Sequence, residues 1–152
     1  MCRKSRKTLK EFIFILLYAF IIFAFLYNFR IIKVDGVSME PTLKNKSHIL
    51  VKRYNDELSV DDIIVFRQEN DLCIKRVAAI SGDFISLKEG SVCINNVIYN
   101  DYKYSGYSSS YIIENDEVFV LGDNSRNSID SRNFGPIKKN EIKYVKIRKD
   151  EN

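Results

Sequence analysis

The feature that most constrains this chain is an uncharged, apolar run near its start, FIFILLYAFIIFAFLYNF, which occupies residues 12–29. A helix of that length rises roughly 27 Å at about 1.5 Å per residue, which is close to the thickness of the hydrocarbon core of a bilayer. Asn28 is the single strongly polar residue in the run. The run therefore predicts one helix that crosses a membrane.

Two other interpretations of this run are a cleaved secretory signal and a buried core helix. The apolar region of a signal is usually about 7–15 residues long and ends in small residues of the A-x-A type. This run is longer, and its two alanines, Ala19 and Ala24, are separated and flanked by bulky side chains. Its length and its flanks favour an uncleaved anchor.

Charge divides the chain where this run ends. Residues 1–30 contain six Lys or Arg and one Glu, a net charge of +5, and residues 31–152 contain 18 Lys or Arg and 19 Asp or Glu, a net charge of −1. Basic residues that precede an anchor stay in the cytoplasm. We therefore expect a basic cytoplasmic N-terminus at 1–11, a transmembrane anchor at 12–29 and an extracytoplasmic domain at 30–152, in a single-pass protein of the cell membrane. The near-neutral domain argues against a nucleic-acid partner.

Beyond the anchor, the pattern changes to short segments rich in β-branched and aromatic residues, separated by turn residues such as SGD, EGS and INN. The segments that predict strands are 49–53, 63–67, 72–80, 84–88, 117–121 and 142–148. No long segment after the anchor has a helical period. The sequence therefore predicts an all-β domain of short antiparallel strands, arranged as a barrel or sandwich and preceded by one transmembrane helix.

Ser38, in the segment VDGVSMEPTL (34–43), is a candidate nucleophile that has no histidine beside it. His48 lies in a lysine-rich stretch, and we interpret it as structural or solvated. Lysine can replace histidine as the base, but a free amine with a pKa near ~10.4 is protonated at neutral pH. Burial among apolar groups lowers that pKa by up to several units. A lysine base should therefore lie within an apolar strand.

Lys75, in the segment DLCIKRVAAISGD (71–83), meets this condition. Strand alternation places Cys73, Lys75 and Val77 on one face, so the lysine shares that face with small apolar neighbours. A lysine on a half-exposed strand is more often simply solvated. Periodicity alone leaves both interpretations open.

The segment VLGDNSRNSIDSRNFGPI (120–137) joins the end of a strand to a polar run. In such a run, hydroxyl groups can hold a buried amine and an Asp–Arg pair can lock a turn. An ordinary surface loop rich in turn formers has the same composition. Its side chains that can bond to one another are Asp123, Asn124, Arg126, Ser128, Asp130, Ser131 and Arg132.

The remaining features suggest no metal or cofactor. Cys73 and Cys93 would lie outside the cytoplasm, where a disulfide can form, although two buried free thiols fit the sequence equally well. No C-x-x-C motif or histidine cluster predicts a metal site. The Ser- and Tyr-rich segment 102–111 is interpreted as an exposed loop or hairpin.

Taken in order, these segments resemble the type I signal peptidases, which are membrane-anchored Ser-Lys proteases, and most closely the short lysine-using form typical of Gram-positive bacteria. The resemblance covers nearly the whole chain: a basic N-terminus, one anchor and then four motif boxes. GVSMEPTL resembles the nucleophile box, DDIIVF the strand box, IKRVAAISGD the lysine box and GDNSRNSIDSRNFG the final loop box. Two boxes depart from the family pattern, with Ser81 in place of a proline and Ser125 in place of an arginine.

The resemblance implies roles for single residues. Ser38 matches the nucleophile and Lys75 the general base, while Ser128 matches the serine that orients that lysine. Asp130 and Arg132 match a pair that shapes the site. The backbone N–H of Ser38 would be one oxyanion donor. Some relatives use a serine two residues before the nucleophile as the other donor; Gly36 stands there in this chain, which leaves the second donor open.

The resemblance also implies the activity: removal of signal peptides from exported preproteins, after an A-x-A-like site, without a cofactor. The expected partners are those signal peptides and the lipid bilayer, and the oligomeric state stays open. Self-cleaving repressor peptidases also use Ser-Lys, but they carry a DNA-binding domain where this chain has an anchor. The alternative that stays open is a non-catalytic or narrow-substrate relative that acts in pilus or surface-protein assembly.

Overall fold

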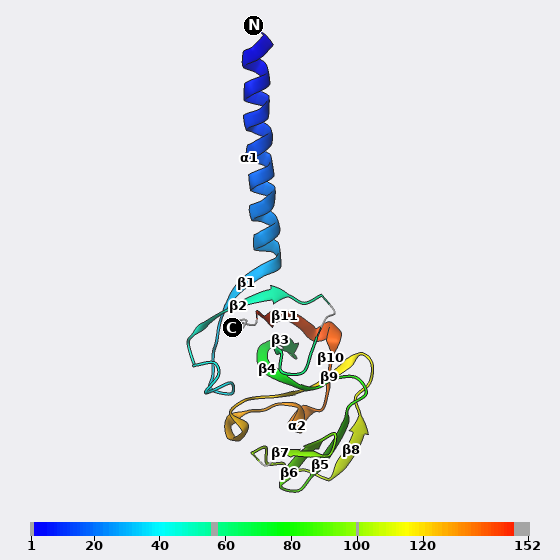
Figure 1. The fold of residues 1–152 in the computed structure, drawn as a ribbon. Coiled ribbons are helices and arrows are strands. Elements are labelled where there is room, and N and C mark those ends of the chain that lie inside the picture. Colours follow the sequence, from blue (N-terminus) through cyan, green and yellow to red (C-terminus); the bar gives the residue numbers. More distant parts are fainter. Residues whose placement is uncertain (1, 56–57, 100, 148–152) are drawn as a thin grey trace. The chain divides into compact units, whose positions relative to one another are not determined.

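The computed structural model describes residues 2–55, 58–99 and 101–147, and the side chains from residue 10 onward. The chain divides into two compact units, Met1–Arg30 and Ile31–Asn152 (Figure 1). The first unit contains the helix α1 (Cys2–Asn28), and the second contains nearly all the β-structure.

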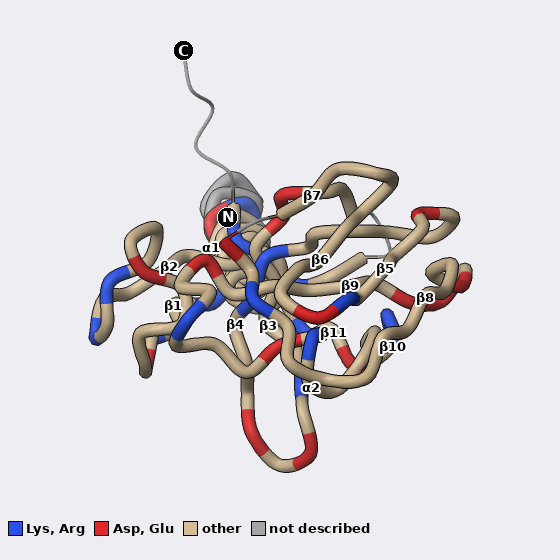
Figure 2. The backbone as a smooth tube through the Cα atoms, turned by 90° about the horizontal axis from the view of Figure 1, so that it is seen from below, with Lys and Arg blue, Asp and Glu red and all other residues tan. Residues whose placement is uncertain are grey.

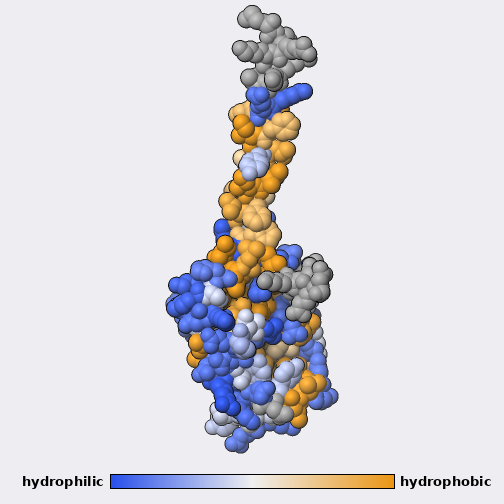
Figure 3. Space-filling model, turned by 60° about the vertical axis from the view of Figure 1, so that its left-hand side comes forward, coloured by the Kyte–Doolittle hydropathy of each residue, from blue (hydrophilic) through white to orange (hydrophobic). Residues whose placement is uncertain are grey.

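Helix α1 presents apolar side chains over most of its described length (Figure 3). Within the described residues, the segment Lys10–Asn28 is long and apolar enough to cross a membrane, and none of it is buried. The helix ends at Asn28, one residue before the expected end of the anchor, and Phe29 begins the strand β1.

The larger sheet of the second unit contains seven strands among the described residues, in the order β1-β2-β11-β3-β4-β9-β10. From β2 to β10, each strand pairs with its neighbour in antiparallel fashion. The bounds are β1 Phe29–Lys33, β2 His48–Arg53, β3 Ile63–Gln68, β4 Asp71–Ala79, β9 Glu117–Leu121, β10 Ile137–Lys138 and β11 Ile142–Lys146. The two strands β4 and β9 lie side by side near one end of this order.

The smaller sheet has the order β7-β6-β5-β8 and is also antiparallel. Its strands are β5 Phe84–Lys88, β6 Ser91–Ile94, β7 Val97–Tyr99 and β8 Ser109–Ile112. Asn95 and Asn96 both have positive φ, 48° and 68°, and form the two-residue turn between β6 and β7. This conformation gives the twist that a tight hairpin needs, and asparagine tolerates it better than most residues.

Strand β9 joins the hydrophobic cores of the two sheets. Val118 and Val120 pack in one core with Ile64 and Phe66, whereas Phe119 and Leu121 pack in another with Ile85 and Leu87 of the smaller sheet. Successive side chains of a strand point to opposite faces, so a strand that is buried on both faces is apolar throughout. Because alternate side chains of EVFVL are buried in the two cores, the end of β9 is held between them. The loop that follows this end carries part of the candidate site.

The expected fold class is confirmed: an antiparallel β-domain follows one apolar helix. The helices of the described β-domain are short, namely η1 (Ser125–Asn127), α2 (Ser131–Phe134) and η2 (Lys139–Glu141). In the segment 102–111, which was expected to be an exposed loop or hairpin, the last residues form β8 against β5. Acidic and basic residues are interspersed over the backbone of the domain, consistent with its near-neutral charge (Figure 2).

Candidate active site

Ser38 lies in the connection between β1 and β2, which apolar side chains hold in place. Val34, Met39 and Leu43 are buried in a third core with Val65 of β3. The backbone N–H of Leu43 donates to the carbonyl of Met39 at 2.8 Å, which closes a turn directly after the serine. Burial of Met39 fixes the backbone beside Ser38, so the serine side chain has a defined position.

Lys75 reaches this serine from strand β4. Its Nζ donates a hydrogen bond to Oγ of Ser38 at 2.9 Å, and the lysine is only 5% exposed. Burial lowers the pKa of the Lys75 ammonium, while the nearby Cys73 and Asp130 act in the opposite direction. A neutral amine at the same distance can accept the serine proton. The face expected from strand alternation is the observed one, since Val77 and Ala79 are buried along with the lysine.

The loop after β9 packs directly on the segment that carries Ser38. The backbone N–H of Asn124 donates to the carbonyl of Ser38 at 2.9 Å, and its side-chain amide donates to the carbonyl of Val37 at 3.2 Å. Gly122 has no room for a side chain: a Cβ there would lie 2.7 Å from the Ser38 carbonyl oxygen and would overlap the side chain of Ser128. Glycine at this position therefore permits a close approach of the loop to Ser38.

Asp130 and Arg132 form a buried ion pair within this loop. Asp130 is fully buried and Arg132 is 9% exposed. Nε and Nη2 of the arginine donate to the two carboxylate oxygens at 2.8 and 2.9 Å, a bidentate geometry. The carboxylate also accepts the backbone N–H of Gly122 at 3.0 Å and caps the N-terminus of α2. The pair thus connects the start of the loop to its end.

Ser128 lies beside Gly122, and its Oγ is buried with no hydrogen-bond partner among the residues that the structure describes. The bond to Lys75 that the resemblance implies is therefore not formed in this structure. A buried hydroxyl without a partner carries a desolvation cost. The orienting role of Ser128 stays a prediction.

Gly36 has φ of +106°, a conformation that favours glycine, and it borders the same cleft as Ser38. Its backbone N–H donates to Oδ1 of Asn45 at 3.1 Å. That amide is therefore engaged within the loop. The second oxyanion donor is not identified by these contacts.

An ion pair that sequence reasoning missed joins strand β4 to the same loop. Nε and Nη2 of Arg76 donate to the carboxylate oxygens of Asp123 at 2.8 and 2.7 Å. Strand alternation places Arg76 on the face opposite Lys75, and nothing in the sequence marks its partner. Arg76 pairs with Leu121, and Asp123 lies two residues beyond Leu121. Only the structure gives this strand register, so the sequence alone could not predict the ion pair.

A cleft of about 330 Å³ opens beside Ser38 and Lys75. Its walls come from two segments, 32–39 and 72–75, with Val65 between them. Most of its lining is apolar, and both segments can present backbone groups to an extended peptide. Cys73, which borders this cleft, and Cys93 in the smaller sheet are both free thiols.

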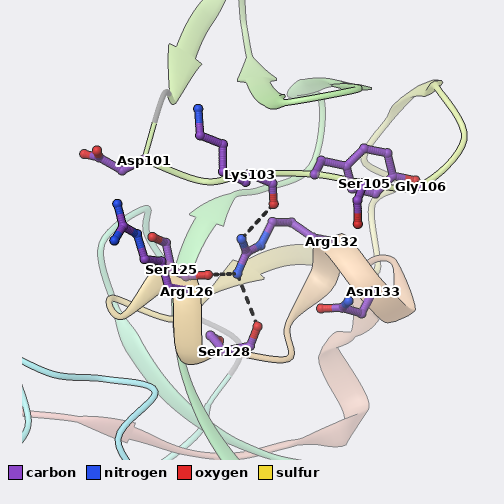
Figure 4. A pocket seen from close by; sticks show the side chains of 10 residues that line it. Asp101, Lys103, Ser105, Gly106, Ser125, Arg126, Ser128, Arg132 and Asn133 are labelled. Carbon is purple, nitrogen blue, oxygen red and sulfur yellow. Dashed lines mark hydrogen bonds between the residues drawn. The ribbon is translucent and has the colours of Figure 1, made fainter.

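A second hollow, of about 540 Å³, lies between the segment 101–106 and the loop 125–133 (Figure 4). Arg132 occupies its centre, and Ser128 contributes to its wall. Its lining is more polar than that of the cleft.

A serine hydroxyl that accepts a hydrogen bond from a buried lysine amine thus lies beside a cleft on a β-fold. The family model "Signal peptidase, peptidase S26" matches residues 5–145. The chain belongs to this family of peptidases, as the resemblance predicted.

Relatives with similar sequences come from bacteria and plants. The chain is similar to signal peptidase I of Bacillus amyloliquefaciens, with 33% identity over 66% of this chain and 63% of that protein. It is similar to signal peptidase I P of Bacillus subtilis subsp. natto, with 29% identity over 88% of this chain and 82% of that one. A plant relative is the mitochondrial ATP-independent inner membrane protease subunit 1b of Arabidopsis thaliana, with 39% identity over 67% of this chain and 58% of that protein.

The matched region thus spans less than two thirds of the first and third of these relatives. A solved signal peptidase I from Enterococcus faecalis V583 aligns with 59% of this chain and 96% of that one, at 21% identity and a TM-score of 0.46. The family assignment does not depend on that alignment.

Proposed function

We propose that the protein is a membrane-anchored serine endopeptidase that removes signal peptides from exported proteins with a Ser38–Lys75 dyad. The observation that carries this proposal is the 2.9 Å contact between Oγ of Ser38 and Nζ of a lysine that is 5% exposed. Burial favours the neutral amine, which is the form that can act as a base at physiological pH. Membership of the signal peptidase family is consistent with this chemistry.

The proposed reaction is acyl transfer in two steps. Lys75 takes the proton of Ser38 as Oγ attacks the peptide carbonyl, and the backbone N–H of Ser38 donates to the oxyanion that forms. The carbon–nitrogen bond then breaks, and the leaving amine receives the proton from Lys75. Lys75 next deprotonates a water that hydrolyses the acyl-enzyme ester, and Ser38 recovers its proton. Asp130 and Arg132 act by holding the loop against the dyad.

The substrate would bind as an extended strand in the cleft between segments 32–39 and 72–75. The limited volume of that cleft agrees with small side chains at the first and third positions before the cut, the A-x-A pattern of signal-peptide ends. The basic residues at the start of α1, before its apolar segment, support an N-terminus in the cytoplasm and a β-domain on the other side of the membrane. The enzyme would then meet its substrates where their cut sites leave the bilayer.

Cleavage of a preprotein that carries an A-x-A site, by the full chain in detergent, tests this function. Wild type should cut after the second small residue, and both Ser38→Ala and Lys75→Ala should lose at least about a thousandfold in kcat/KM. Lys88→Ala is the matched control, because Lys88 is an exposed strand lysine in the smaller sheet. No cleavage of several such preproteins by wild type would favour the non-catalytic or narrow-substrate alternative. Cleavage that survives Lys75→Ala would refute the proposed base.

A further inference from the structure

The guanidinium of Arg132 donates hydrogen bonds to carbonyl groups on both walls of the second hollow. Its Nη2 donates to the carbonyls of Ser125 and Ser128, at 2.8 and 3.3 Å, which belong to the same loop as the arginine. Its Nη1 donates to the carbonyl of Lys103 at 3.1 Å, which belongs to the connection between β7 and β8. Figure 4 shows the guanidinium between these groups. The arginine thus bridges the smaller sheet's connection and the loop that touches the dyad.

The ring of Tyr102 covers the face of this guanidinium. The central carbon of the Arg132 guanidinium lies 5.3 Å from the ring centroid, within the range of a cation–π interaction. Tyr102 is half-buried and makes an edge-to-face contact with Tyr99 of β7, with ring centroids 6.2 Å apart. It also packs against the core of the smaller sheet. The position of this ring is therefore set by the smaller sheet.

A chain of direct contacts leads from the guanidinium to the dyad. Arg132 holds both carboxylate oxygens of Asp130, and this carboxylate accepts the N–H of Gly122. Gly122 in turn lies against Ser128 and the carbonyl of Ser38. A planar guanidinium that can tilt would let its carboxylate partner turn, and the N–H of Gly122 would then lose its acceptor. A small displacement of the loop at Gly122 would then shift Ser38, because Gly122 lies against the carbonyl group of Ser38.

We propose that Tyr102 is a positioning residue for the Ser38–Lys75 dyad: its ring fixes the plane of the Arg132 guanidinium, and so the smaller sheet sets the geometry of the loop at Gly122 and Ser128. This inference rests on the proposed function for its effect on catalysis. It assigns a role to the connection 101–104 that neither the motif boxes nor the dyad itself contains. The aromatic face carries that role, and the phenol hydroxyl does not.

Two substitutions separate the aromatic face from simple burial. Tyr102→Phe keeps the ring, whereas Tyr102→Leu keeps an apolar side chain without a π face. In the full chain in detergent, with a peptide that carries an A-x-A site, the Leu variant should lose about tenfold in kcat with KM within twofold of wild type. The Phe variant should retain wild-type kcat. Tyr107→Leu, on a tyrosine of the same connection that is 97% exposed, is the matched control and should change neither value.

A second measurement needs no catalysis. Amide hydrogen exchange, followed by NMR on the full chain, should be faster at Gly122 in Tyr102→Leu than in wild type and unchanged in Tyr102→Phe. The amide of Val65, in the fully buried core of β3, reports on global unfolding and should exchange at the wild-type rate. A Leu variant with wild-type exchange at Gly122, or with equal acceleration at Val65, overturns the inference.

The two measurements also separate this inference from the proposed function. If wild type cleaves and Tyr102→Leu has wild-type kcat, the inference is wrong and the proposed function stands. Equal losses of kcat in the Leu and Phe variants contradict the role of the aromatic face. If wild type does not cleave its substrates, the proposed function fails, and exchange at Gly122 alone decides whether Tyr102 positions the loop.

Discussion

In the proposed reaction Lys75 is the base for Ser38, so its protonation state controls the rate, and this leads to a prediction at the scale of one residue. Burial lowers the pKa of Lys75 below its ordinary value of 10.5. The ammonium form cannot accept a proton, so kcat/KM should rise about tenfold per pH unit below that pKa and level off above it. We expect the inflection well below pH 10.5 in a pH–rate profile measured with a neutral peptide substrate. An inflection at or above 10.5 would mean that the amine is effectively solvated.

The pH dependence of folding stability provides a control for the pH–rate profile, because the pKa of Lys75 governs both. In the unfolded chain the lysine protonates first as pH falls through about 10.5, whereas the buried amine protonates only at a lower pH. The folded state therefore loses stability between those two pH values on acidification and recovers it as pH rises. In Lys75→Met this dependence should disappear, so thermal unfolding of the two proteins should differ more at pH 7 than near pH 10.5.

At the scale of elements, the Arg76–Asp123 pair ties strand β4, which carries Lys75, to the loop that follows β9. The arginine and aspartate side chains are 28% and 11% exposed, and the contact is bidentate. A double-mutant cycle with Arg76→Met and Asp123→Asn should give a coupling of about 1 kcal/mol in unfolding free energy, after allowance for solvent screening. Each single substitution should also lower kcat, because the loop then holds Ser38 less firmly.

The exposed pair Lys138–Asp116 is the matched control for that cycle. Both of its side chains are more than half exposed, so solvent and salt screen the interaction and no coupling should be resolved. Equal coupling in the two pairs would show that the Arg76–Asp123 contact contributes no more than a surface ion pair. Its role in loop positioning would then be lost.

Local composition predicts the strands that are buried on both faces. It does not predict the strands that form only because a neighbouring strand offers a free edge. IIVFR and EVFVL are apolar enough to be recognised as strands, and both form as expected. Strand β8 is Ser- and Tyr-rich and becomes a strand because β5 offers it an edge. Strand β10 contains only two residues, and its existence depends on its pairing with β9. Such strands form because of tertiary pairing, and the local sequence does not predict them.

The features of the candidate site are likewise of two kinds, those that depend on one strand and those that depend on contacts between elements. Alternation along 71–79 predicts correctly that Lys75 points to the buried face, since that depends on neighbours in one strand. That this face meets Ser38, 37 residues away in sequence, comes from the resemblance and not from periodicity. The Arg76–Asp123 pair and the Tyr102 contact depend on strand register and on a connection from another sheet. Nothing in the local pattern could supply them.

At the scale of the whole molecule, the proposed function assigns separate contributions to the two compact units, chemistry to Ile31–Asn152 and location to Met1–Arg30. A truncated protein that begins at Phe29 keeps β1 and should cleave a short A-x-A peptide in detergent with kcat/KM within about twofold of the full chain. On a preprotein inserted in vesicles, the full chain should be faster by about a hundredfold, because anchoring raises the effective concentration of enzyme at the cut site.

Replacement of residues 12–28 by an unrelated apolar helix, with the basic residues before it retained, is the matched control for this truncation. If α1 acts only as an anchor, the replacement should recover the vesicle rate, since any helix that spans the bilayer confines the domain to its surface. Failure to recover it would mean that the α1 sequence itself contributes to substrate recognition. Loss of peptide cleavage on truncation would mean that the β-domain needs the helix for its own chemistry. Equal vesicle rates with and without the helix would contradict the role of anchoring altogether.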